Sequence, residues 1–384
     1  MPLTHQKPRI AALISISTLT LLLSACGGDD MAAAPHSFAL VVGDRSNSHV
    51  PAPDALIDEV PDDLVPGARV AAFEVDGSAD GVTVFSQLVP KAETDFDQKE
   101  VPGQVKAELR SALEAKKPDQ PEANTLGAIS SAVRALHDTS GAKTIKVADS
   151  LLSTAGVLQF QVGLLDSTPE DVVASVNKDE LPDLNGIDVE IYGAGEVRDP
   201  QAALTESKRK RLEEIWNRLL KLAGAKSVTF HSALSERKDI GSLPPVTVVA
   251  ISNAIAAAPP VGCTQILSEQ LVQFVPDTAD FADPNAARQT IAAVAENMKG
   301  CQGKISVTGT TSSWGDAAGR QRTSQDRAET VRNELAAAMG IDASAIVALG
   351  VGMDFPGYVN DRDASGRLIP AEAAKNRTVR ITEG

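Results

Sequence analysis

Aromatic side chains and cysteines are scarce in this sequence of 384 residues. Aromatic residues supply 3% of the chain, whereas hydrophobic residues together supply 43%, so any core must be built mainly from aliphatic side chains and alanine. The three cysteines have no neighbouring histidine, which argues against the usual zinc spacings. Gly-x-Ser-x-Gly, His-Glu-x-x-His and P-loop motifs are also missing. We therefore expect a protein that is not an enzyme.

Positive charge is in deficit as well. The chain has 36 Lys and Arg against 51 Asp and Glu, a formal net charge of −15. Such an acidic surface repels the phosphates of nucleic acids and of anionic lipids. We therefore expect no nucleic-acid partner. The length favours two domains with connecting segments.

An apolar run near the N-terminus predicts export. It covers residues 10–23, fewer than the roughly 20 residues of a membrane-spanning helix, and two basic residues precede it, as in a secretory signal peptide. The run closes on Leu23-Ser24-Ala25-Cys26, which resembles a bacterial lipobox. This resemblance implies removal of residues 1–25, lipidation of Cys26 and a lipid anchor on the extracytoplasmic face of a bacterial membrane, with residues 26–35 as a tether. An ordinary secretory signal or an uncleaved anchor is the alternative.

Two cysteines remain if Cys26 carries lipid. Cys263 and Cys301 would then face an oxidising compartment, where disulfides form and persist. We therefore expect these two residues to form a disulfide.

Strands and helices alternate in the first half of the chain. This alternation predicts an α/β domain that is doubly wound around a mostly parallel sheet. Turn-rich residues 76–81 join two of the strands and predict an antiparallel hairpin at one edge. The predicted strands are 37–43, 69–75, 81–89, 143–148, 188–192 and 227–231, and the predicted helices are 98–116, 125–136, 169–176 and 206–223.

Polar side chains follow two of these strands. Asp44, Ser46 and Ser48 come directly after the first strand, Thr125 opens a helix, and Asp149 ends a later strand. In an open parallel sheet, ligands collect at the carboxyl ends of the strands, and oxygen donors suit Mg²⁺ or Ca²⁺. The alternative is that the first three residues only cap the next segment and make turn hydrogen bonds.

The order of these residues resembles the metal-ion-dependent adhesion site (MIDAS) of von Willebrand factor A (vWA) domains, Asp-x-Ser-x-Ser followed by a Thr and an Asp. The resemblance covers residues 36–235 and implies a vWA-like domain that binds a protein partner through Mg²⁺ or Ca²⁺. By this resemblance Ser46, Ser48 and Thr125 would contact the cation, and Asp44 and Asp149 would do so directly or through water. Ser150 follows Asp149 where the family usually has Gly.

Residues 236–262 predict a linker. They hold the proline pairs 244–245 and 259–260 around the apolar residues 246–255. The apolar centre is compatible with a strand added to either domain.

The last part of the chain predicts a second domain of β-α-β-α-β-β order, and its motifs resemble the OmpA-like domain of OmpA, Pal and MotB proteins. Residues 309–315 align with that family's Gly-His-Thr-Asp-x-x-Gly, 323–328 align with Leu-Ser-x-x-Arg-Ala, and 376–379 align with Asn-Arg-Arg-Val. The resemblance covers residues 263–384. It implies an α+β domain in the cell envelope that binds peptidoglycan.

The family holds the diaminopimelate unit of the stem peptide between an Asp and an Arg. Arg327 stands at the Arg position, and Ser312 stands where the Asp is expected. Arg377, in the Asn-Arg motif, completes the predicted site. Asp316 is a possible substitute for the missing carboxylate; otherwise the site reads a different stem peptide or binding is vestigial. A purely structural role for Arg327 is the alternative.

Overall fold

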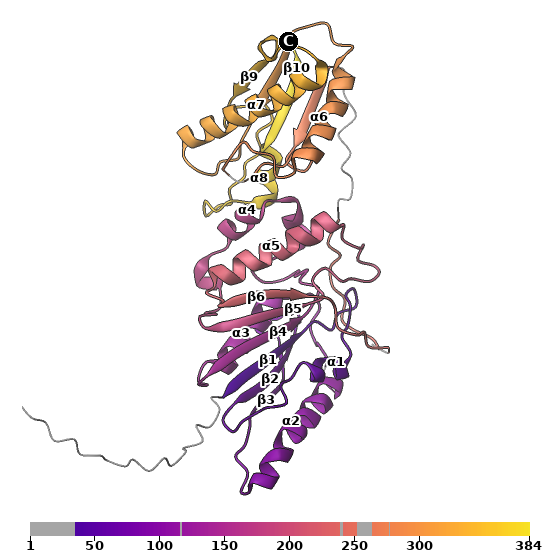
Figure 1. Ribbon diagram of the computed structural model, residues 1–384, viewed down its shortest axis with the longest axis vertical. Coiled ribbons are helices and arrows are strands. Elements are labelled where there is room, and N and C mark those ends of the chain that lie inside the picture. The colour runs from indigo at the N-terminus through magenta and orange to yellow at the C-terminus, as the bar shows by residue number, and fades with distance from the viewer. Residues whose placement is uncertain (1–34, 116, 239–240, 252–262, 276) are drawn as a thin grey trace, which may run out of the picture. The chain divides into compact units, whose positions relative to one another are not determined.

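The computed structural model describes residues 35–115, 117–238, 241–251, 263–275 and 277–384 (Figure 1). The predicted signal peptide, Cys26, the tether up to residue 34 and residues 252–262 of the predicted linker lie outside the described residues. Among the residues that the structure describes, no helix is both long and apolar enough to cross a membrane.

A six-stranded sheet forms the centre of the N-terminal domain. Its strand order is β3-β2-β1-β4-β5-β6, and all neighbours are parallel except the antiparallel pair β2–β3 (Figure 1). The predicted mostly parallel sheet with an antiparallel hairpin at one edge is therefore confirmed. The strands are β1 His36–Val42, β2 Arg69–Glu74, β3 Val82–Leu88, β4 Ala142–Ala148, β5 Ile187–Tyr192 and β6 Ser227–His231.

Helices cover both faces of this sheet because successive strand residues point to opposite faces. From β1, Phe38 and Leu40 pack with α1 and α2, whereas Ala39 and Val41 pack with α3 and α5. The helices are α1 Pro53–Asp58, α2 Asp95–Ala115, α3 Thr125–Leu136, α4 Pro169–Ser175 and α5 Glu206–Leu222, and three 3₁₀ turns lie between α3 and β5: η1 Phe160–Val162, η2 Leu164–Asp166 and η3 Lys178–Glu180.

The loops after β1 and β4 leave the sheet side by side. Val42 pairs in register with Ala148, and the Gly43 amide donates to the Ala148 carbonyl at 2.9 Å. A Cβ atom on Gly43 would lie 1.8 Å from Oδ2 of Asp149. Only glycine therefore permits the two loops to come this close.

Residues 241–251 of the predicted linker form no strand. They instead contact the N-terminal domain: the Val249 amide donates to Oε1 of Gln201 at 2.7 Å, and the Pro245 carbonyl accepts from the Glu122 amide at 3.1 Å. Proline supplies no amide for a strand ladder.

The C-terminal domain contains a four-stranded sheet of order β7-β10-β8-β9 (Figure 1). Strand β10 is antiparallel to both neighbours, and β8 is parallel to β9. The predicted β-α-β-α-β-β order is present, with one further short helix, α8, before the last strand. The elements are β7 Thr264–Ser268, α6 Pro284–Met298, β8 Ile305–Gly309, α7 Ala317–Met339, the 3₁₀ turn η4 Ala343–Ala345, β9 Val347–Gly350, α8 Pro370–Asn376 and β10 Thr378–Glu383.

Helix α7 begins earlier than the sequence predicts. The residues Thr323, Ser324, Gln325 and Asp326 resemble a capping box and so predict a helix start there. In the structure Asp316 is the N-cap and accepts a hydrogen bond from the Gly319 amide at 2.7 Å. Alanines at the first two helical positions favour continuation. Ser324 consequently lies inside the helix, where its hydroxyl accepts from the Gly352 amide at 3.0 Å.

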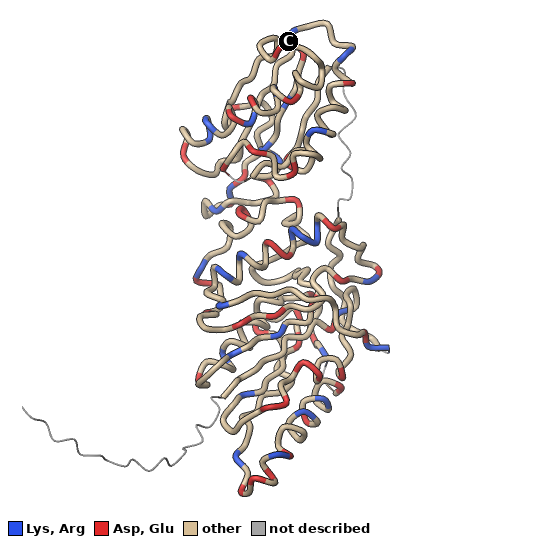
Figure 2. The backbone as a smooth tube through the Cα atoms, viewed as in Figure 1, with Lys and Arg blue, Asp and Glu red and all other residues tan. Residues whose placement is uncertain are grey.

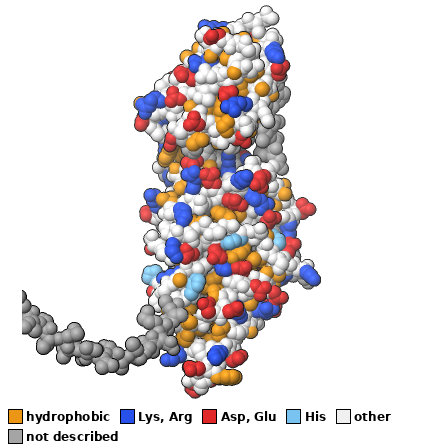
Figure 3. All heavy atoms as spheres, viewed as in Figure 1, with side chains coloured by type: hydrophobic (Ala, Val, Ile, Leu, Met, Phe, Trp, Pro, Cys, Tyr) orange, Lys and Arg blue, Asp and Glu red, His pale blue; other side chains and the backbone are white. Residues whose placement is uncertain are grey.

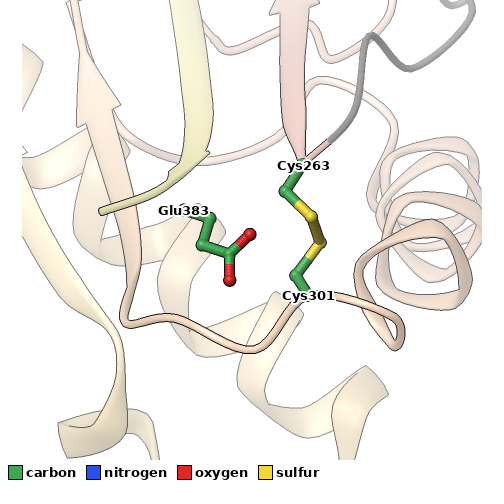
Figure 4. Close-up of side chains that lie close together, drawn as sticks. All are labelled: Cys263, Cys301 and Glu383. Carbon is green, nitrogen blue, oxygen red and sulfur yellow. A yellow bond between two sulfur atoms is a disulfide. The ribbon is translucent and has the colours of Figure 1, made fainter.

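The expected disulfide joins Cys263 to Cys301, with an S–S distance of 2.08 Å (Figure 4). It links the residue before β7 to the loop between α6 and β8. Glu383 lies beside it, and its carboxylate accepts a hydrogen bond from the Gly303 amide. Because both sulfurs are oxidised, this trio offers no thiolate for a metal.

Candidate functional site

The N-terminal domain brings together the residues of the loops after β1 and β4 and the start of α3. Asp149 lies at the centre of this cluster. Its Oδ1 accepts hydrogen bonds from the Thr125 hydroxyl at 3.1 Å and from the Leu151 amide at 2.5 Å. The Thr125 hydroxyl in turn accepts from Ser153 Oγ at 2.9 Å.

Arg45 supplies a buried positive charge in this cluster. Its side chain is 2% exposed, and its Nη2 donates to Oδ2 of Asp149, which is fully buried. The guanidinium also donates to Ser150 Oγ at 3.0 Å and to the Leu152 carbonyl at 3.2 Å. Sequence reasoning missed Arg45 because the Asp-x-Ser-x-Ser pattern leaves that position open.

Asp44 lies apart from this ion pair and faces a different arginine. Its Oδ2 is 3.4 Å from Nη1 of Arg237, and its Oδ1 is buried without a hydrogen-bond partner. Burial raises the pKa of Asp44 to about 6, although Arg237 and Lys117 oppose the rise. Burial also raises the pKa of the neighbouring Glu74 well above its usual value, and the charge of Asp44 adds to that effect.

The two predicted serine ligands are placed differently. Ser48 is fully buried, and its hydroxyl donates to the Gly43 carbonyl at 3.3 Å, the turn hydrogen bond expected from the alternative interpretation. Ser46 is half-buried.

A divalent cation does not fit these side chains as they stand. Both oxygens of Asp149 are already hydrogen-bonded, and a guanidinium occupies the side on which a cation would approach Oδ2. Within the described ranges, the only three His, Cys, Asp or Glu residues whose ligand atoms lie within 4.8 Å of one another are Cys263, Cys301 and Glu383. The Mg²⁺ or Ca²⁺ site therefore stays a prediction, and the thermal experiment proposed below tests it.

The C-terminal domain gathers the other set of predicted residues. One cleft is lined by Ser312 and Asp316 from the loop after β8, by Arg327 from α7, and by Arg377, which lies between α8 and β10. The sequence motifs therefore selected residues that lie near one another in space.

The loop after β8 is held firmly at the edge of this cleft. Oδ2 of the buried Asp361 accepts from the Ser313 amide at 2.8 Å and from Asn376 Nδ2 at 3.1 Å. The Tyr358 hydroxyl donates to the other oxygen at 2.8 Å. Burial alone would raise the pKa of Asp361, but the hydrogen bonds from Ser313, Tyr358 and Asn376 more than offset it and hold this pKa below its usual value.

Arg327 and Arg377 are two of the four arginines that line the cleft. Arg327 projects from α7, lies over the Phe274 ring at 4.9 Å and donates from Nε to the Thr278 carbonyl at 3.0 Å. Arg377 donates from Nε to Ser312 Oγ at 3.4 Å. Guanidinium groups of this kind bind carboxylates well.

A carboxylate that sequence reasoning missed lies in the same cleft. Glu269 directly follows β7, and its Oε2 accepts from Nη1 of Arg377 at 3.1 Å. Its position directly after a predicted strand of the same sheet could have indicated it from the sequence. Asp316 is exposed and uses one oxygen for capping α7, and its amide hydrogen bonds lower its pKa.

Comparison with known proteins identifies part of the C-terminal domain. Residues 273–366 match the model of the OmpA family. No curated protein matches the chain.

Several solved structures resemble part of the chain. The cell wall anchor of the T6SS from Pseudomonas aeruginosa is 25% identical, with 31% of this chain and 79% of that chain covered and a TM-score of 0.25. The peptidoglycan-associated lipoprotein from Burkholderia pseudomallei is 23% identical, with 29% and 88% covered and a TM-score of 0.24. The periplasmic domain of Helicobacter pylori MotB is 18% identical, with 31% and 79% covered and a TM-score of 0.24.

The motifs at residues 309–315 and 323–328 lie within the family match at residues 273–366, whereas the motif at residues 376–379 lies beyond its end. The sheet to the N-terminal side has a different strand order and lies outside the residues of this match. The chain thus joins an N-terminal six-stranded, mostly parallel α/β domain to a C-terminal OmpA-like domain.

Proposed function

We propose that this chain is a cell-envelope protein whose OmpA-like domain binds the stem peptide of peptidoglycan. The observation that carries the proposal is the cleft in which Ser312, Asp316, Arg327 and Arg377 meet. The names of the similar cell wall anchor and peptidoglycan-associated lipoprotein support the same ligand.

The charges of the cleft suit a ligand with both a carboxylate and an ammonium group, such as a diamino acid. Arg327 binds the carboxylate, and the Phe274 ring and the Thr278 carbonyl fix its guanidinium in place. Ser312 has no charge for the ammonium group. Glu269, which lines the same cleft, supplies that carboxylate instead.

The test is co-sedimentation of the full-length protein with purified, diaminopimelate-containing peptidoglycan. Arg327→Ala is expected to weaken retention by about tenfold or more, because a charge-assisted bond is worth about 1.5–3 kcal/mol. Glu269→Gln is expected to weaken it as well. Arg332→Ala is the matched control, because Arg332 lies on the same helix, outside the cleft, and bonds to Asn333.

Retention of Arg327→Ala equal to that of wild type would reject the site. It would leave Arg327 with the structural role that the sequence also allowed. Equal losses for Arg332→Ala and Arg327→Ala would show that retention follows net charge alone and would reject the site too.

For the N-terminal domain, the proposal is a scaffold that presents a binding surface to a protein partner in the envelope. The vWA resemblance implies a Mg²⁺ or Ca²⁺ contact to that partner, but the Arg45–Asp149 pair favours the alternative of a domain with no resident cation. Lipidation of Cys26 would hold both domains at the extracytoplasmic face of a membrane.

A further inference from the structure

The partners of the Arg45 guanidinium are of the kind that a metal cation would have. It comes from the loop after β1, yet its guanidinium reaches three groups of the loop after β4: the Asp149 carboxylate, the Ser150 hydroxyl and the Leu152 carbonyl. All three offer oxygen atoms. The positive group of the first loop therefore holds the second loop through three of the second loop's oxygens.

Because Arg45 and Asp149 are both buried, each of the two charges needs the other as its partner. The side chains of Arg45 and Asp149 are 2% and 0% exposed. A buried charge must be paired, because an unpaired one loses its hydration without compensation. Each of the two groups thus neutralises the other, and Thr125 and the Leu151 amide complete the hydrogen bonding of the carboxylate.

We propose that the Arg45 guanidinium takes the place of a divalent cation in the N-terminal domain, so that the strand-end cluster is held together without metal. The proposal concerns this domain alone and goes beyond peptidoglycan binding by the other one. Arg45 is a positioning residue in this scheme, since it fixes Asp149 and the two loops.

The charge of Arg45 also works against a metal ion. A divalent cation at Oδ2 of Asp149 would lie within a few ångströms of a buried guanidinium, where solvent screens repulsion poorly. Binding would require the side chain to leave its three partners first. Removal of the guanidinium, in contrast, frees the oxygens of Asp149, Ser150 and Leu152, and oxygen donors suit Mg²⁺.

The experiment follows thermal unfolding of the full-length protein by Trp216 fluorescence, in a Trp314→Phe background. Trp216 is a local reporter, because its indole nitrogen donates to the Leu151 carbonyl at 3.0 Å. Wild type and Arg45→Ala are freed of metal with EDTA and then measured with and without millimolar MgCl₂ or CaCl₂. Arg134→Ala, which removes an exposed ion pair with Asp80, is the matched control.

We expect the wild-type midpoint to be the same in EDTA and in MgCl₂. Arg45→Ala is expected to lower it by roughly 10 °C, the effect of breaking a buried ion pair, and MgCl₂ is expected to restore part of the loss. Arg134→Ala should change little and should not respond to metal.

A second variant separates charge from packing. If Arg45 serves to neutralise Asp149, Arg45→Gln/Asp149→Asn is expected to unfold at a higher temperature than Arg45→Gln alone, because it no longer buries an unpaired carboxylate. A wild-type midpoint that rises with MgCl₂ overturns the proposal even if every Arg45 variant fails to fold. An Arg45→Ala protein that folds and ignores metal overturns it as well, as does a double variant no more stable than Arg45→Gln.

Discussion

Ser312 shows how much a single side chain decides in the C-terminal cleft. It stands at the position where the OmpA-like pattern has an aspartate, and its hydroxyl accepts from Arg377 at 3.4 Å. A hydroxyl binds an ammonium group without charge assistance, which weakens the bond by about 1–2 kcal/mol.

The first prediction is that Ser312→Asp strengthens peptidoglycan binding by about tenfold, because it gives the ligand's ammonium group a second carboxylate besides that of Glu269. Calorimetry of the full-length protein with a soluble muropeptide measures the change. The gain should vanish in an Arg327→Ala background, where the ligand's carboxylate has lost its partner. Weaker binding by Ser312→Asp would contradict the assignment of the cleft.

The second prediction concerns Asp361, whose pKa lies below the usual 3.8 because of its hydrogen bonds. An acid with a lowered pKa adds stability above its unfolded-state pKa and loses it as the pH falls through the folded-state value. Asp361→Asn should therefore destabilise the C-terminal domain at neutral pH by about 2 kcal/mol.

Melting curves of wild type and Asp361→Asn across acidic pH check this sign. The difference between the melting temperatures of the two proteins should become smaller as the pH drops below 3.8. Asp354→Asn, at an exposed aspartate a few residues earlier, is the control and should follow wild type throughout. A difference that widens toward acid would contradict the prediction.

The functional residues that the sequence analysis missed were missed for the same physical reason. Arg45 and Glu269 belong to these sites because of the ion pairs that they form with Asp149 and Arg377. The partner of a long, flexible side chain cannot be read from the sequence, because such a side chain can reach several neighbours. Thr125, Asp149 and Arg327 were predictable because strand ends, helix starts and motif spacing fix where the backbone carries them.

At the scale of elements, short apolar runs and the alternation of strands with helices were enough to predict both sheets, but capping patterns were less reliable. Residues 323–326 have the pattern of a helix start, yet α7 already begins at Ala317, directly after its N-cap Asp316. This helix lies so close to β9 that a Cβ on Gly350 would be 2.2 Å from the Gln325 amide nitrogen. Close packing of this kind depends on distant parts of the chain, which local patterns do not report.

The third prediction addresses the disulfide as a link between elements. Replacing Cys263 and Cys301 by serine should cost about 4 kcal/mol, because the bond closes a loop with a sequence separation of 38 residues. Hydrogen exchange measured by mass spectrometry should then speed up for amides of β8 and β10. Exchange in β1 and β4 serves as the internal control and should stay unchanged.

At the scale of the whole molecule, the excess of acidic side chains is spread along the chain and is not concentrated in one segment. Acidic and basic residues alternate along the chain, including helix α5, where Lys210 pairs with Glu206 and Arg218 with Glu214 (Figure 2). The face shown in Figure 3 likewise carries both signs side by side. This distribution suits a soluble surface and does not mark a docking site for a polyanion.

The fourth prediction is that the mature chain begins at a lipidated Cys26. Mass spectrometry of the protein purified from bacterial membranes should find a diacylated N-terminal cysteine and no residues 1–25. A Cys26→Ser variant should lack the lipid mass. An unmodified Cys26 in the mature protein would contradict the lipobox interpretation.

The position of the disulfide also has a mechanical consequence. Cys263 is the residue at which the chain enters β7, an edge strand held by β10. Tension that arrives along the chain from the N-terminal side therefore reaches a covalent bond to Cys301 before it reaches the β7–β10 ladder. If one end of the molecule is fixed to a membrane and the other to a wall, the disulfide transmits part of the force to the loop that holds Cys301. The force on β7 alone is then smaller, and β7 does not separate from β10 first.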